Sequence, residues 1–304
     1  MTAVITKMIT LVALMFIGFF CCKLKITSAV FNKQVSGLVM NVFLSATILK
    51  SVINVEPTMS NGEIYQIVAL FFLMMVIAGL VGFVAAKILR IPKEQEGVVL
   101  CLITYMNTAF VGFPIVETVY GPEAVFYASL SGIPFNLMIY SVGTLTLCGG
   151  TTGEKIPFRK MLTAPLVMTL IGAVIFMFRI PFPKVVEDTV STLAGATIPM
   201  SMIIIGTSLG EVPIKDALMD WRNYIVSLVR LVICPIVTYL ILSRLIDNAM
   251  IVGIITIMAA TPSAMVLTVL CIQYDRDDSL ASRGIFISTV LSAITIPFVI
   301  WLLL

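Results

Sequence analysis

The sequence contains no histidine and little charge: of its 304 residues, only 12% are Asp, Glu, Lys or Arg. Histidine is a common metal ligand and the most frequent acid–base group near neutral pH, so its absence argues against most metal-dependent or acid–base enzymes. Soluble domains carry about 25% charged residues. This chain is 60% hydrophobic and cannot hide so much apolar surface from water, so lipid must surround most of it.

The short motifs of common enzymes are also missing. There is no Walker A loop, no GxGxxG after a strand, no HExxH and no GxSxG. The glycine-rich run at 149–153 joins two apolar segments, so we interpret it as a linker. The six cysteines form no CxxC pair and lie in or beside apolar runs, where cysteine behaves as a small hydrophobic residue. We therefore predict no enzymatic activity, no cofactor and no metal site.

Long apolar runs dominate what remains, and the mean hydropathy is +1.10. A membrane-spanning helix needs about 20 apolar residues, and open strands in lipid would leave backbone groups unpaired. The sequence predicts an all-α integral membrane fold with ten transmembrane helices. The expected segments are 4–22, 34–52, 64–86, 97–119, 123–148, 161–179, 187–209, 223–243, 249–271 and 283–303.

The distribution of Lys and Arg predicts the orientation of these segments. With the N-terminus outside, thirteen basic residues fall in cytoplasmic loops and five fall outside. We expect a multi-pass protein of the cell (inner) membrane with both termini outside. The run from Ile9 to Cys22 is read as the first span and not as a signal peptide, because positive charges follow it and no cleavage site does.

A faint internal repeat appears when the chain is shifted by 154 residues. The matched pairs are Tyr120 with Tyr274, Glu123 with Asp277, Asn107 with Thr261 and Ser45 with Pro199. Five helices per repeat is an odd number, so the two halves must insert with opposite orientation, as in many secondary transporters. We predict repeats at 1–150 and 151–304, intertwined in one membrane unit.

Two segments are interrupted by Gly and Pro at corresponding places, residues 107–114 and 259–264. In lipid, the freed backbone groups must find partners or line a wet cavity. Two broken helices, 4 and 9, that cross near the midplane would direct half-helix N-termini at one point. That point would favour an anionic group.

Further polar residues lie in or near the apolar segments, and each has either a structural or a functional interpretation. Asn136 is either a link between helices or a substrate contact. Arg230 either extends to the surface or pairs structurally, or it contacts substrate or a gate. Glu117 belongs to a group of acidic residues near the ends of the broken segments that are either helix caps or part of a gate.

Several runs resemble the auxin efflux carrier family. The similarity covers almost the whole chain and is most specific in Asn107–Pro114. Its other parts are Tyr120-Gly121, Glu123-Ala124, Asn136-Leu137, Ala196–Pro199, Gly206–Leu209, Thr261–Ala264 and Ser288–Ser292.

The resemblance implies an inverted five-plus-five fold with a scaffold, a mobile transport part, elevator-like motion and a homodimer. It places substrate at the crossing of the two broken helices. The crossing residues carried over are Asn107, Thr108, Ala109, Gly112 and Pro114 with Thr261, Pro262, Ser263 and Ala264, and Asn136 joins them as the fifth-helix asparagine.

The chain departs from the family pattern at Ser45, where many members have proline, and at Tyr140, where many have tryptophan. Both positions are expected near the substrate site, so the substrate of another family member cannot be assigned to this protein. The resemblance implies a bacterial-type permease, and with the helix N-termini at the crossing we expect it to move a small organic anion such as a carboxylate, in a lipid bilayer and without nucleic acid. A sodium-coupled bile-acid-type symporter and a non-transporting membrane receptor are the alternatives.

Overall fold

The computed structural model describes residues 2–53, 61–148, 163–211 and 221–303. Within these residues all regular structure is helical, apart from one isolated bridge between Met106 and Ser263. Each of the ten expected segments contains helix. Five described helices are long and apolar enough to cross a membrane: Gly62–Ile88, Ala124–Leu147, Lys184–Glu211, Trp221–Leu245 and Asp278–Leu303. The fold is that of an integral membrane protein.

The inverted repeat is a separate matter and stays a prediction. Its boundary near residue 150, the glycine-rich linker and the basic residues Lys155, Arg159, Lys160 and Lys215 lie outside the described residues. The chain divides by its contacts into two compact units, and each draws on both halves of the sequence.

Unit 1 consists of Met1–Ala69, Ala109–Ile133 and Leu162–Glu211. Its helices are α1 (Thr2–Lys23), α2 (Ala29–Leu38), η1 (Val39–Phe43), α3 (Leu44–Lys50), the start of α4 (Asn61–Ile88), most of η2 (Thr108–Gly112), α6 (Phe113–Tyr120), α7 (Ala124–Ser129), α11 (Ala164–Phe178), α12 (Lys184–Gly195) and α13 (Thr197–Glu211).

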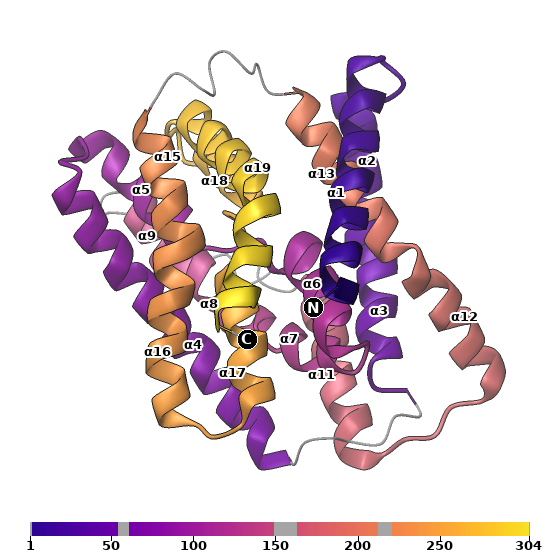
Figure 1. Ribbon diagram of the computed structural model, residues 1–304. Helices are drawn as coiled ribbons and strands as arrows, with labels where there is room; N and C mark the ends of the chain where they lie inside the picture. The colour runs from indigo at the N-terminus through magenta and orange to yellow at the C-terminus, as the bar shows by residue number, and fades with distance from the viewer. Residues whose placement is uncertain (1, 54–60, 149–162, 212–220, 304) are drawn as a thin grey trace. The chain divides into compact units, whose positions relative to one another are not determined.

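The closest packing in unit 1 joins α1 to α13, which run side by side in Figure 1. Gly206 and Gly210 form a small-xxx-small pair that lets two backbones approach. A Cβ added at Gly206 would overlap the Met15 carbonyl oxygen, and one at Gly210 would lie 2.7 Å from the Cβ of Cys22. Lys23 Nζ donates to the Gly210 carbonyl at 2.9 Å. Glycine therefore sets the distance between these helices.

Unit 2 consists of Leu70–Thr108, Pro134–Met161 and Val212–Leu304. Its helices are the rest of α4, α5 (Lys93–Thr104), most of α8 (Gly132–Met138), η3 (Ile139–Gly143), α9 (Thr144–Leu147), α15 (Trp221–Leu228), η4 (Val229–Ile233), α16 (Cys234–Leu245), α17 (Ala249–Ala259), α18 (Val266–Gln273) and α19 (Asp278–Leu303).

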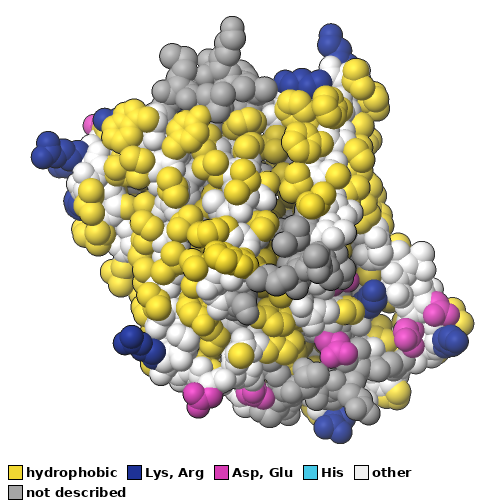
Figure 2. Space-filling view, viewed as in Figure 1, with side chains coloured by type: hydrophobic (Ala, Val, Ile, Leu, Met, Phe, Trp, Pro, Cys, Tyr) yellow, Lys and Arg dark blue, Asp and Glu magenta, His cyan; other side chains and the backbone are white. Residues whose placement is uncertain are grey.

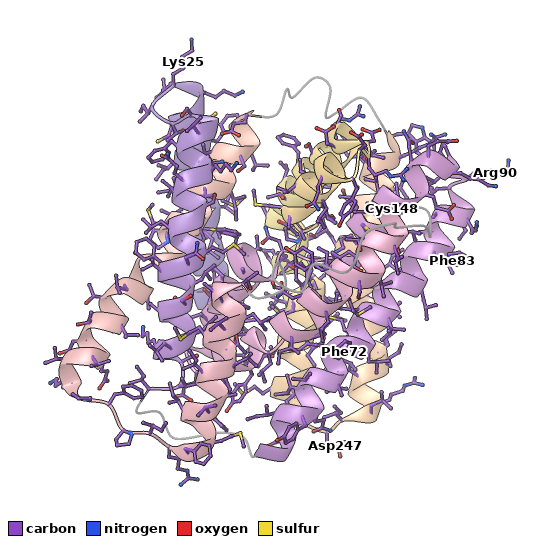
Figure 3. All side chains as sticks on the ribbon, turned by 180° about the vertical axis from the view of Figure 1, so that it is seen from behind. Lys25, Phe72, Phe83, Arg90, Cys148 and Asp247 are labelled. Atoms are coloured by element: carbon purple, nitrogen blue, oxygen red, sulfur yellow. The ribbon has the colours of Figure 1, made fainter. Side chains whose placement is uncertain are left out.

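Helix α19 is central to unit 2, where it packs against α5, α15, η4, α16, α17 and α18. Figure 1 shows it in yellow beside the orange α15 and α16. Arg90, after α4, and Asp247, between α16 and α17, mark opposite ends of this unit in Figure 3. Between these ends, the face of unit 2 seen in Figure 2 is largely hydrophobic. Phe83 on α4 is 50% exposed, as expected for a side chain that faces lipid.

Four described helical spans widen into a π-helical turn: η1, η2, η3 and η4. Two of these turns have a proline two residues further on, Pro114 after η2 and Pro235 after η4. A proline ring clashes with the carbonyl four residues before it, and a wider turn relieves that clash. The prolines therefore widen these helices without breaking them.

Candidate functional site

A buried crossing of two chain segments lies inside unit 2. Helix α5 ends at Thr104, and the next three residues, 105–107, run antiparallel to residues 262–264, which follow α17. The Asn107 N–H donates to the Pro262 carbonyl at 2.8 Å, and the Ala264 N–H donates to the Tyr105 carbonyl at 3.0 Å. These two bonds satisfy backbone groups that the helix breaks would otherwise leave open.

The bond pattern is reciprocal. In each tripeptide the third residue donates and the first accepts, so Asn107 corresponds to Ala264, and Met106 faces its own counterpart, Ser263. This differs from the sequence-based pairing of Asn107 with Thr261. The first half has three more residues than the second between the crossing and the Tyr120–Tyr274 pair, and the η2 turn lies in that stretch. The local pairing at the crossing therefore does not follow the shift of 154 residues that the sequence comparison used.

Hydroxyl groups secure the helix ends at the crossing. Ser263 Oγ donates to the Leu102 carbonyl of α5 at 2.7 Å, and the Ser263 N–H donates to Ser288 Oγ of α19 at 3.3 Å. Thr261 Oγ1 donates to the Met258 carbonyl at 2.8 Å. The protons of Ser263 and Thr261 are thus used by the fold, and their remaining lone pairs can only accept hydrogen bonds.

Tyr105, at the crossing, contacts the helical segment that contains Asn136 and Tyr140. Its hydroxyl donates to the Met138 carbonyl at 3.0 Å, and its ring meets that of Phe135 edge to face at 6.0 Å. Gly143 lies against the same ring: an added Cβ would be 2.9 Å from the tyrosine oxygen. Sequence reasoning missed Tyr105, because a tyrosine in an apolar run resembles any core residue.

The structure collects most of the expected site residues in unit 2. These are Asn107, Thr108, Asn136, Tyr140, Thr261, Pro262, Ser263, Ala264 and Arg230. Asn107 and Asn136 are 5% and 7% exposed, so both amides are buried. The break in helix 4 comes earlier than the Gly and Pro pattern predicts, at residues 105–107.

The other expected residues belong to unit 1: Ala109, Gly112, Pro114, Glu117 and Ser45. Pro114 lies in the first turn of α6, and Glu117 lies later on the same helix, where its carbonyl accepts from the Gly121 N–H at 3.0 Å. Ser45 is buried on α3, and its hydroxyl has no hydrogen-bond partner among the described residues. Two residues on, Thr47 and Thr197 share a hydrogen bond of 2.7 Å between α3 and α13.

Arg230 lies in η4 and is only 1% exposed. A side chain that reached the membrane surface would keep its guanidinium in water, so this burial excludes that reading. In the described parts of the chain, no group of three or more Cys, Asp or Glu side chains could hold a metal ion.

The apolar helices and the buried crossing define an integral, multi-pass membrane protein. The chain belongs to the membrane transport protein family, whose model matches residues 3–157 and 151–300. This is the auxin efflux carrier-like family that the motifs resemble.

Two transporters from archaea are similar in sequence to this chain, one over part of its length and one over nearly all of it. An uncharacterized transporter of Methanothermobacter thermautotrophicus is 30% identical over 193 residues, and the aligned part spans 63% of each chain. An uncharacterized transporter of Methanocaldococcus jannaschii is 24% identical over 303 residues, which is 96% of each chain. The family is one of membrane transporters.

Proposed function

We propose that this protein is a secondary transporter that moves a small organic anion, such as a carboxylate, by elevator-type alternating access. The substrate site is the crossing of helices 4 and 9. The observation that carries the proposal is the reciprocal pair of backbone hydrogen bonds between residues 105–107 and 262–264, in the unit that also contains the buried amides of Asn107 and Asn136.

The chemistry of the crossing suits a carboxylate. Helix α18 starts two residues after Ala264, so the positive end of its dipole lies next to the crossing. Each amide supplies two N–H donors and one acceptor, and charged hydrogen bonds gain strength where water is excluded. A small acid could therefore exchange its water shell for fixed donors.

The elevator mechanism assigns unit 2 the role of carrier and unit 1 that of scaffold. Unit 2 contains the crossing, whereas unit 1 contains the tight glycine contact between α1 and α13, which suits a rigid support. The reciprocal crossing also supports two inverted five-helix repeats at 1–150 and 151–304, because a local two-fold relation of this kind follows from such repeats.

The test is uptake of radiolabelled acids into proteoliposomes, including malonate, malate and indole-3-acetate, with and without sodium and proton gradients. Replacing Asn107→Ala or Asn136→Ala should raise the apparent Kd for the transported acid by about tenfold or more, because a hydrogen bond to a charged group is worth about 1.5–3 kcal/mol. Asn41→Ala is the matched control. Asn41 is exposed, and its Nδ2 donates to the Gly37 carbonyl at 2.7 Å, within its own helix.

The outcomes separate the alternatives. Unchanged affinity in both amide variants would contradict the site. Binding without flux in correctly inserted protein would favour a receptor, and uptake that requires sodium would favour a bile-acid-type symporter. Saturable uptake without sodium dependence is the expected result.

A further inference from the structure

Arg230 is the largest fully buried side chain described in the protein. Its Nε and Nη2 atoms have no hydrogen-bond partner among the described residues, and the thiol of Cys234, one turn further on, is the neighbour that interacts with the guanidinium. A guanidinium keeps its charge in any protein environment. A buried charge of this kind requires a compensating partner.

The described acidic residues of unit 2 do not supply that partner. They lie in first turns and in the loops between helices: Glu94, Glu96, Asp247, Asp275, Asp277 and Asp278. Arg230 instead occupies the middle of the Trp221–Leu245 span. The described part of unit 2 thus has one buried cation in a membrane span and no buried carboxylate to neutralise it.

Arg230 is part of a row of polar residues at helical spacing along one face of this span. The row is Asn223, Ser227, Arg230, Cys234 and Thr238, all of which are buried. Asn223 Nδ2, Ser227 Oγ and Thr238 Oγ1 also have no hydrogen-bond partner among the described residues. Apolar helices rarely contain such a row, because each unsatisfied buried polar atom is costly. The row therefore indicates a ligand or ordered water along this face.

The elements around Arg230 connect it to the crossing. The η4 turn packs against α5 and α19, which supply Leu102 and Ser288 to the crossing. On α19 the hydroxyls of Ser288 and Thr289 donate to the Ile285 carbonyl. Their protons are therefore used, so these groups can accept hydrogen bonds but do not compete with Arg230 as donors to an anion.

The two open nitrogen atoms identify the ligand chemistry. Nε–H and Nη2–H point in the same direction along one edge of the guanidinium, which is the edge that binds a carboxylate through two parallel hydrogen bonds. We propose that Arg230 is an anion-binding residue that takes the carboxylate of the transported acid, with Asn223 and Ser227 as neighbouring polar groups. This deepens the proposed transport function and rests on it for the identity of the ligand.

The experiment measures thermal unfolding of the purified protein in nanodiscs while sodium acetate, sodium malonate or sodium chloride is added at matched sodium concentration. The two carboxylates should stabilise the wild type, and chloride should do so much less. Arg230→Gln should weaken the apparent affinity for the better carboxylate on the order of 30-fold or more. Arg244→Gln, on the exposed end of the same span, should match the wild type.

Arg230→Lys keeps the charge but lacks the planar fork. It should fold and bind the carboxylate more weakly than the wild type. If Arg230→Gln does not fold, this variant still tests whether Arg230 binds the carboxylate. Equal carboxylate binding in the wild type and in Arg230→Lys would overturn the proposal. So would stabilisation by chloride alone, which would make Arg230 the site of a resident inorganic anion.

Flux measurements separate this inference from the transport function. Carboxylate binding that depends on Arg230, without flux, would refute transport and leave the anion site standing. Normal flux with unchanged affinity in Arg230→Gln would refute the anion site and leave transport standing.

Discussion

Replacing Tyr105→Phe tests whether the crossing and the α8–η3 helix form one rigid assembly. The substitution removes the hydroxyl that donates to the Met138 carbonyl at 3.0 Å but keeps the ring that packs on Phe135. Tyr105 is 2% exposed, so water does not readily replace the lost donor. Leaving a buried carbonyl unsatisfied costs about 1–3 kcal/mol, and measured side-chain bonds in membranes are at the low end of such values. We expect a loss of about 1–2 kcal/mol in the free energy of unfolding.

The assay is reversible unfolding by SDS in mixed micelles, followed by tryptophan fluorescence. Both tryptophans, Trp221 and Trp301, lie in unit 2, so the signal reports on the unit that contains the crossing. Tyr65→Phe is the control, because Tyr65 is 69% exposed and its substitution should change stability by less than about 0.5 kcal/mol. If Tyr105→Phe is as stable as this control, the hydroxyl does not hold α8–η3 in place, and the reasoning about Asn136 fails with it.

Three further predictions follow from packing, capping and topology. Gly206→Ala should force α1 and α13 apart and cost about 2 kcal/mol or more, whereas Gly195→Ala, which meets no atom within 4 Å, should be tolerated; equal folded yields would contradict this. Ser263→Ala should cost about 1–3 kcal/mol in SDS unfolding, because it leaves the Leu102 carbonyl without its 2.7 Å donor, and a wild-type midpoint would count against the capping role. In a cysteine-free background, Lys25→Cys should react with an impermeant maleimide only after the membrane is opened, and Lys184→Cys should react in intact cells; the reverse pattern would invert the predicted orientation.

Hydropathy was sufficient to predict an all-helical membrane fold with helix in each of the ten segments, because a span must present an apolar surface to lipid; five of the described helices are long and apolar enough to cross a membrane. The prediction of breaks in the fourth and ninth segments also succeeded, since the chain leaves the helix at 105–107 and at 260–265. The predicted position of the first break was less accurate. Gly112 and Pro114 suggested it, but these residues follow a widened turn, and the chain leaves the helix before them. A proline signals a disturbed helix without specifying whether the turn widens or breaks.

Local sequence patterns indicated some residues of the candidate site, whereas others depend on contacts between distant parts of the chain. Asn107, Thr261 and Ser263 could be found because polar residues in apolar segments need an explanation. The role of Tyr105 depends on a contact with Met138, 33 residues away, which no local pattern encodes. The row from Asn223 to Thr238 did carry a signal, since its members recur at helical spacing, and it would have been found by following Arg230 along its helix face. The division into two units depends on long-range packing and could not be derived from the order of the segments.

The crossing also has a consequence for biosynthesis. Leu102 and its capping residue Ser263 are 161 positions apart, and the backbone partners of Tyr105 and Asn107 are made equally late. At about 5–20 residues per second, the ribosome needs on the order of ten seconds or more to reach them. During that interval the broken end of α5 has open backbone groups that lipid cannot satisfy. Until residues 262–264 are made, these backbone groups need water or another part of the chain as partners, and an unfinished chain would be open to quality-control proteases in that interval.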